Sequence, residues 1–131
     1  MLQLTSTITE NATIEIGLRD IEVPKPGADE VLIEVQASPI NPSDLGTLVG
    51  AGDLTSIRVE GEGDQAKVIM DIPESVMWAM KPRIGKPLPV GNEGSGVVTE
   101  AGENAKHLIG KVVSAVGGGM YAQYRVLPAM A

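Results

Sequence analysis

Residues 37–44 read Ala-Ser-Pro-Ile-Asn-Pro-Ser-Asp, and they follow a run, residues 31–37, in which side chains alternate between an apolar and a mixed face. Alternation with a period of two predicts a β-strand. Beyond Pro39, Asn41 is placed to cap a helix, Pro42 to be its first residue and Asp44 to supply a first-turn carboxylate. Gly50 can end this helix, so the sequence predicts a strand that leads into a helix of about two turns.

A second informative stretch, residues 89–98, reads Pro-Val-Gly-Asn-Glu-Gly-Ser-Gly-Val-Val. On local grounds, residues 41–44 could be no more than a helix cap and residues 94–96 no more than a tight bend. A helical turn is expected over residues 73–80, and Pro82, Pro87 and Pro89 argue against regular structure after it. Further strands are predicted at residues 14–18, 56–60, 67–71, 96–100, 111–116 and 120–127. Many short strands separated by turns indicate a small β-barrel or sandwich.

Composition limits the classes of function. The chain has 131 residues, enough for one domain, and 16 Gly and nine Pro suit a β-rich fold. It contains no cysteine, and its net charge of −7 disfavours nucleic-acid binding. No secretory signal and no apolar run of membrane-spanning length is present, so a cytoplasmic protein that does not enter membranes is the default expectation.

Two other features are interpreted as structural. Residues 61–66 have the glycine spacing of a dinucleotide-binding loop, but a strand pattern follows them where such a loop would open a helix. A hairpin turn is therefore predicted there. His107 is the only histidine, and without cysteines it cannot build a zinc site, so it is expected at a turn or on the surface.

The ordered combination of motifs resembles the GroES-like catalytic domain of the medium-chain dehydrogenase/reductases, especially their zinc-independent, quinone oxidoreductase-like branch. The series comprises residues 37–44, residues 89–98, Gly102, residues 110–113 and residues 119–124, the last of which read Gly-Met-Tyr-Ala-Gln-Tyr. The resemblance implies a mainly β fold, a GroES-like, partly open β-barrel with short helices. It covers residues 2–127, although residues 51–88 match poorly.

The resemblance also implies a site. Asn41 and Asn92 occupy the positions at which zinc-dependent members place metal ligands, so no metal is expected. Asn41, Ser43, Asn92 and Tyr121 are the candidate catalytic residues: the amides would stabilise negative charge on a substrate oxygen, and Ser43 or Tyr121 would supply a proton. Asn41, Pro42 and Asp44 are the candidate cofactor-binding residues. The candidate structural residues at the site are Glu93, Gly94 and Gly96.

The implied parent is an NADPH-dependent quinone or enone oxidoreductase. We expect residues 1–131 to form one GroES-like domain without the dinucleotide-binding domain, to bind no NADPH and to be inactive alone. Exposed strand edges are expected to favour self-association. The alternative is a stand-alone GroES-like barrel that serves as a binding or assembly module, which the acidic character of residues 51–66 disfavours.

Overall fold

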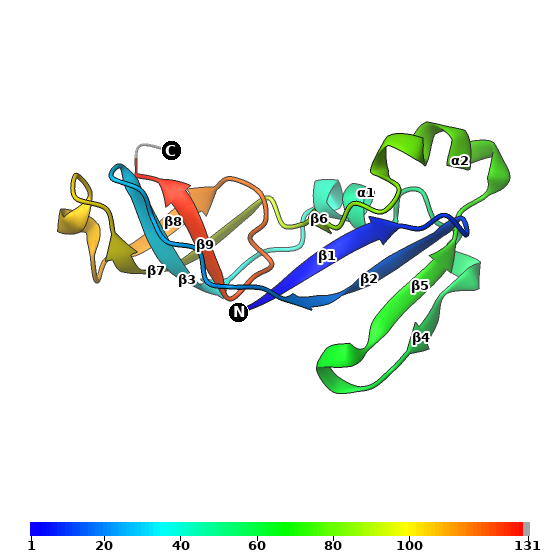
Figure 1. Ribbon diagram of the computed structural model, residues 1–131, viewed down its shortest axis with the longest axis horizontal. Coiled ribbons are helices and arrows are strands. Elements are labelled where there is room, and N and C mark those ends of the chain that lie inside the picture. Colours follow the sequence, from blue (N-terminus) through cyan, green and yellow to red (C-terminus); the bar gives the residue numbers. More distant parts are fainter. Residues whose placement is uncertain (130–131) are drawn as a thin grey trace. The chain divides into compact units, whose positions relative to one another are not determined.

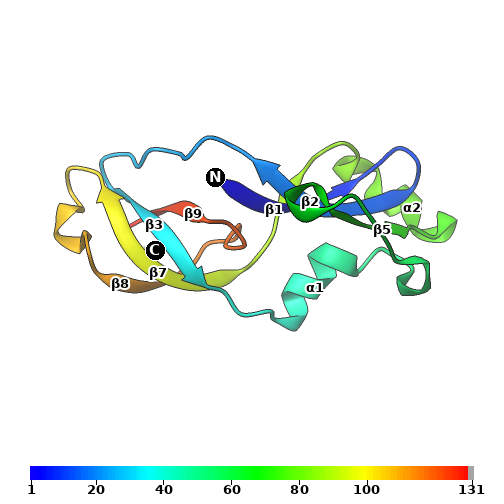
Figure 2. The same cartoon turned by 90° about the horizontal axis from the view of Figure 1, so that it is seen from below.

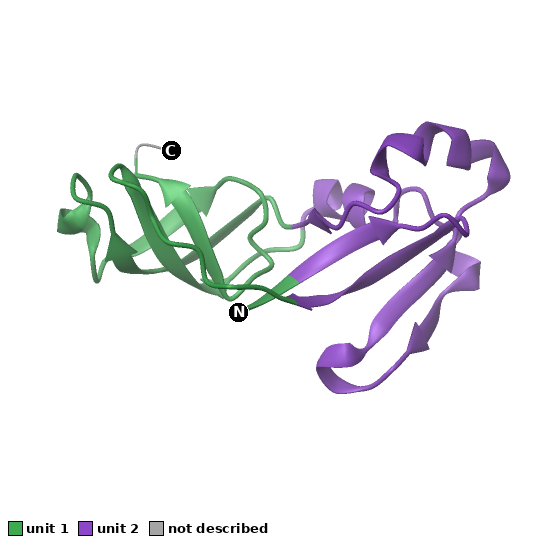
Figure 3. Ribbon diagram, viewed as in Figure 1, with its two compact units in different colours: residues 1–3, 20–40, 91–131 green, residues 4–19, 41–90 purple. Residues whose placement is uncertain are grey.

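The computed structural model describes residues 1–129, so the last two residues of the predicted domain lie outside the described part. The chain folds into two compact units, which Figure 3 colours separately. Unit 1 holds residues 1–3, 20–40 and 91–131, and unit 2 holds residues 4–19 and 41–90. Each unit has its own sheet and its own apolar core, and each is described by itself.

Over the chain as a whole, strand residues outnumber helical residues, so the prediction of a mainly β protein with short helices is confirmed. The helices are α1 (Pro42–Val49) and α2 (Glu74–Met80). The strands are β1 (Leu2–Ile8), β2 (Thr13–Asp20), β3 (Glu30–Ala37), β4 (Arg58–Glu60), β5 (Lys67–Asp71), β6 (Leu88–Pro89), β7 (Glu93–Ala101), β8 (Val112–Val116) and β9 (Tyr124–Pro128). They form a five-stranded sheet of order β4-β5-β2-β1-β6 and a four-stranded sheet of order β8-β7-β3-β9 (Figures 1 and 2).

In unit 1, β3 pairs antiparallel with β7 on one side and with β9 on the other. Val31, Leu32 and Ile33 of this strand are all buried. Two register shifts interrupt the pairing with β7, and the second falls between Val35 and Ala37, where the strand approaches residues 95–96. Bulges of this kind bend a strand and re-aim its end. The end of β3 is thereby directed toward the start of β7.

Glycine is required where β7 passes closest to β3. Gly96 lies opposite Val35, and a Cβ atom at Gly96 would collide with the Glu34 carbonyl oxygen. A Cβ atom at Gly94 would come 2.6 Å from Ser38 Oγ and 2.9 Å from the Ala37 carbonyl oxygen. The stretch that could have been a tight bend is therefore continuous strand, and its glycines serve close packing of two backbones.

In unit 2, β2 pairs with β5, and Ile14, Met70, Ile8 and Ile72 form the buried core. One side of α2, comprising Val76, Met77 and Met80, packs on this core, as the spacing of these apolar residues predicts. Methionine and aliphatic side chains fill the space that aromatic residues commonly occupy, in a chain without Phe.

The predicted helix start is confirmed at α1. Asn41 is the N-cap and Pro42 the first helical residue, and the Asn41 backbone N–H donates to Asp44 Oδ2 at 2.8 Å. Asp44 is only 2% exposed. Its carboxylate therefore satisfies a backbone group at the helix start that water cannot easily reach.

Several predicted boundaries were wrong. Pro82 lies in a 3₁₀ turn, Lys81–Arg83, and Pro89 lies in β6, which pairs with β1 at the edge of its sheet. Proline is tolerated in a first helical turn and on an edge strand because its missing N–H is not needed there. The strand predicted over residues 56–60 begins at Arg58, because Ser56 ends a 3₁₀ turn, and the one predicted over residues 120–127 begins at Tyr124.

The buried carboxylate at α1 can be tested for its contribution to stability. Asp44→Ala removes the acceptor for the Asn41 N–H, and we expect it to lower the free energy of unfolding by about 1–2 kcal/mol. Urea denaturation followed by circular dichroism measures the change. Ser43→Ala, in the exposed neighbouring position, is the control and should have the smaller effect. An Asp44→Ala variant as stable as the parent would show that the cap is dispensable.

The close approach of β7 to β3 makes a second prediction. Gly96→Ala should lower the free energy of unfolding by about 1–3 kcal/mol, because the new methyl group meets backbone that cannot move aside. Gly46→Ala is the matched control, since a Cβ atom at Gly46 in α1 meets nothing within 4 Å. The same substitution there should be neutral or stabilising. Equal stability changes in the two variants, compared in thermal melts, would contradict this account.

Candidate functional site

A pocket of about 650 Å³ lies in unit 1, beside the start of β7. Its walls come from the end of β3, the first residues of β7 and the facing part of β8. The lining residues are Ala37, Ser38, Pro39, Glu93, Gly94, Ser95, Ser114, Ala115 and Val116. The lining includes three serines and one glutamate, and no lysine or arginine contributes to it. This size is within the range of small-molecule sites.

Two hydrogen bonds fix one wall of the pocket. Ser38 Oγ donates to the Met120 carbonyl oxygen at 3.0 Å, and Tyr121 Oη donates to the Pro39 carbonyl oxygen at 2.8 Å. Both bonds join the segment after β3 to a segment 82 residues further along the chain. The Tyr121 hydroxyl proton, for which the sequence suggested a catalytic role, is directed at this backbone carbonyl.

The backbone around Asn92 is also held firmly. The Asn92 carbonyl oxygen accepts from the N–H groups of Gly117 and Gly118 at 3.2 and 3.3 Å, and the Gly91 carbonyl oxygen accepts from Met120 N–H at 3.0 Å. Gly91 has a positive φ of 99°, and a Cβ atom there would come 2.7 Å from the Tyr121 ring. Asn92 itself is exposed, immediately before the half-buried Glu93.

The candidate residues of the first stretch belong to unit 2. Asn41 is half-buried, Pro42 and Ser43 are exposed, and Asp44 is buried at the start of α1. Within unit 2 this arrangement places the Asn41 residue at a capped helix N-terminus. Glu93, Gly94, Asn92, Gly96 and Tyr121 all belong to unit 1.

Sequence reasoning missed part of the pocket wall. Ser38 and Ser95 were present in the two quoted stretches but were not singled out, and Ser114 lies in a β8 pattern that was interpreted only as a strand. Local sequence offers a weak signal for such residues, because a serine at a strand end is ordinary. Their shared position depends on the pairing of β7 with β3 and β8, in which Ser95 lies opposite both Ala37 and Ser114.

Other expectations concern metals, membranes and nucleotide loops. In residues 1–129 no group of three or more His, Cys, Asp or Glu side chains is arranged to hold a metal ion. His107 is exposed in a 3₁₀ turn, and residues 61–66 form the turn of the β4–β5 hairpin, as predicted. None of the helices in the described chain is both long and apolar enough to span a membrane.

Comparison with known proteins identifies the fold. A family model for the alcohol dehydrogenase GroES-like domain matches residues 27–131. A search of curated proteins by sequence gave no match. Among solved structures, the chain resembles a protein assigned as an NADPH:quinone reductase from Mesorhizobium loti, with 25% sequence identity and a TM-score of 0.58. The similarity covers 100% of this chain and 35% of that one.

Two further structures support the fold alone. One is the quinone oxidoreductase from Coxiella burnetii, with 20% identity and a TM-score of 0.59 over 97% of this chain and 34% of that chain. The other is a mycobacterial protein solved with NADPH, with 19% identity and a TM-score of 0.57 over 98% of this chain and 31% of that chain. This chain thus spans about a third of the length of these structures. It belongs to the alcohol dehydrogenase GroES-like domain family of the medium-chain dehydrogenase/reductases.

Proposed function

We propose that this chain is the catalytic, substrate-binding domain of an NADPH-dependent quinone or enone oxidoreductase that works without zinc. The observation that carries the proposal is the pocket at the start of β7, whose lining includes three serines and Glu93, the residue next to Asn92. The similarity to a protein assigned as an NADPH:quinone reductase supports the substrate class. The dinucleotide-binding domain and the whole enzyme's activity are part of the same proposal.

The lining of the pocket suits an uncharged ring better than a phosphate. Phosphate groups are normally bound by arginine, lysine or backbone N–H groups at a helix N-terminus. Here the only charged lining residue is Glu93, which would repel an anion. We propose that a quinone or nicotinamide ring would bury its apolar faces on Ala37, Pro39 and Val116 and accept a hydrogen bond from Ser95 or Ser114, since the Ser38 hydroxyl already donates to Met120. We therefore propose that the pyrophosphate of NADPH is held elsewhere.

In this proposal, NADPH would supply the hydride when bound, and the domain stabilises the negative charge that develops on the substrate. Negative charge on the substrate oxygen requires preorganised donors, and the side-chain amides of Asn41 and Asn92 can donate. Asp44 holds the Asn41 backbone through the bond to its N–H. Tyr121 keeps the Pro39 segment in place, and Ser43, which is exposed, is the proposed proton source. Asn41, Pro42 and Asp44 are also proposed to line the cofactor site.

The contribution of Asn92 can be measured in the enzyme that carries this domain. Asn92→Ala should lower kcat for NADPH-dependent reduction of a quinone by about 100- to 1,000-fold, the usual effect of losing an oxyanion donor, about 2.7–4 kcal/mol. Asn104→Ala, which removes an amide bonded to Asp29 in a turn, is the matched control and should retain activity. Asn41→Ala needs a thermal melt beside the kinetics, because Asn41 also caps α1.

If both asparagine variants turned over normally, these residues would be structural, and a binding or assembly module would become the better explanation of the domain. A quinone that binds the domain but perturbs no signal of Ser95 or Ser114 in an NMR titration would instead place the substrate in another site. The two results separate failure of the mechanism from failure of the pocket assignment.

Independence from zinc is tested by metal analysis. After dialysis against buffer without chelator, elemental analysis of the purified protein should give far less than one zinc per chain, because cysteine is absent and His107 is the only histidine. Activity of the whole enzyme should be unchanged by a chelator. About one zinc per chain would contradict the interpretation of Asn41 and Asn92 as replaced ligands.

Self-association through an exposed strand edge is also part of the proposal.

A further inference from the structure

The β4–β5 hairpin of unit 2 leaves one edge of its sheet open, along the outer side of β4. β4 is the outermost strand of its sheet, and all three of its residues, Arg58, Val59 and Glu60, are exposed. The side chain of Val59 is 65% exposed, and Leu54 and Ile57, in the segment just before β4, are 60% and 49% exposed. An open edge of this kind can hydrogen-bond to a strand of another chain.

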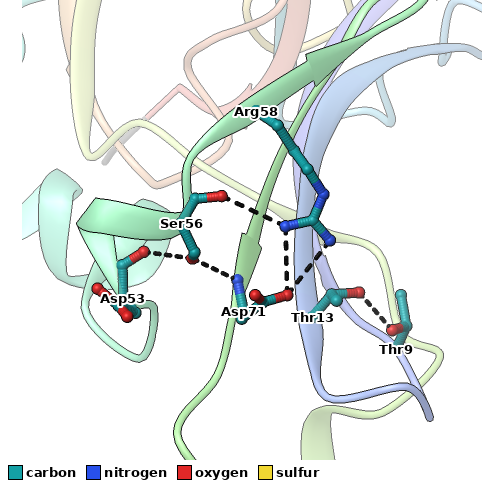
Figure 4. A network of polar contacts seen from close by, with 6 residues as sticks. All are labelled: Thr9, Thr13, Asp53, Ser56, Arg58 and Asp71. Atoms are coloured by element: carbon teal, nitrogen blue, oxygen red, sulfur yellow. Dashed lines mark hydrogen bonds and ion pairs between the residues drawn. The ribbon is translucent and has the colours of Figure 1, made fainter.

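Polar contacts hold the hairpin in one conformation (Figure 4). Arg58 donates through both terminal nitrogens to Asp71 Oδ1 at 3.2 Å, and Asp71 N–H donates to Ser56 Oγ at 2.8 Å. The Thr55 hydroxyl and backbone N–H both donate to Asp53, and these bonds lower the pKa of Asp53. Because the edge is already ordered, a partner strand would not have to bear the entropic cost of forming it.

The two faces of β4 differ in character, because neighbouring side chains on a strand point to opposite faces. Val59 lies opposite Val68, and Val68 lies opposite Ile16, which gives one face an apolar row that runs outward to the edge. On the other face, Glu60 lies opposite Lys67. A strand that adds to this edge must therefore present an apolar residue on one face and matching charges on the other.

The sequence Arg58-Val59-Glu60 meets this requirement when it pairs with itself. In an antiparallel pair centred on Val59, Val59 faces Val59 of the second copy, while Arg58 faces Glu60 of that copy and Glu60 faces its Arg58. The apolar row then continues across the join, and the charges alternate in sign on the other face. Directly opposite residues of opposite charge stabilise a strand pair, and like charges would oppose it.

We propose that the outer edge of β4 binds the β4 edge of a second copy of this chain, with Val59 at the twofold axis. This inference specifies the self-association named above and does not depend on the reductase activity. A three-residue strand buries little surface, so the complex should be weak, with a dissociation constant on the order of micromolar or higher. Self-pairing at a defined register also occupies an edge that other strands could join.

The other outermost strands are β6, β8 and β9, and of these β8 carries the most exposed large apolar residues, Val112 and Val116, at 75% and 70% exposed. β8 is therefore the main rival edge. This strand carries no charged residue to set a register, and a strand without such groups is prone to slip. The charge pattern of β4 therefore favours β4 as the site of specific pairing.

Cysteine crosslinking tests the proposal cleanly, because the chain has no native cysteine. Directly opposite residues in antiparallel strands have Cα atoms about 4.5–5.5 Å apart, which a disulfide can span. Under mild oxidation with diamide, Val59→Cys should form covalent dimers at least about tenfold faster than Val112→Cys, although Val112 on the rival edge is the more exposed valine. Non-reducing gels of matched concentrations measure both rates, and circular dichroism verifies that each variant folds.

The charge pairing is tested within the Val59→Cys protein. Glu60→Gln should slow dimer formation several-fold, and added salt should slow it as well, whereas Glu62→Gln, the same change at the hairpin tip outside the paired strand, should not. Preferential crosslinking of Val112→Cys would move self-association to β8 and overturn the β4 assignment. Slow crosslinking of both variants, with a monomer by sedimentation at high concentration, would overturn self-association while leaving the reductase proposal intact.

Discussion

The antiparallel contact between β3 and β7 is the constraint on which unit 1 depends. β3 lies between two partner strands, and its residues Val31, Leu32 and Ile33 are buried, so its position is set by close packing on both sides. That packing requires a strand without side chains at the points where β7 comes nearest, and Gly94 and Gly96 meet the requirement. Substituting either glycine would move the strand away from β3.

The same contact creates the pocket. Because Gly94 and Gly96 allow β7 to start close to the end of β3, Ser38 and Ser95 reach one cavity, and β8 adds Ser114 to its wall. The hydrogen bond from Tyr121 to Pro39 then fixes the segment that leaves β3. A pocket built in this way is preorganised by backbone packing, and its chemistry can be changed by a few side chains without rebuilding the sheet.

Unit 2 carries an ordered edge strand. Residues 51–88, which lie within the range that the family model matches, fold into a hairpin and a short helix that packs on the unit's core. The ion pair between Arg58 and Asp71 is exposed and contributes little to stability alone. Together with the Ser56 and Asp53 bonds, it holds β4 and the segment before it in place.

Sequence alone determined the features that depend on neighbours in the chain. The alternation of residues 31–37 specified β3. The start of α1 was specified by Asn41, Pro42 and Asp44, and the hairpin turn by the glycines of residues 61–66. Periodicity, capping and turn chemistry are all local properties of the chain. The motif series also identified the family, confirmed by comparison.

Tertiary structure decided what depends on distant partners. β1 was not predicted, and β6 was missed because Pro89 argues against a strand until an edge position makes its missing N–H harmless. The hydroxyl of Tyr121, a candidate proton donor from the sequence, donates to a carbonyl 82 residues away, a contact that local sequence does not encode. The pocket and its serines arise from strand pairing, and pairing between distant segments is set by packing of the whole unit, which no local pattern encodes.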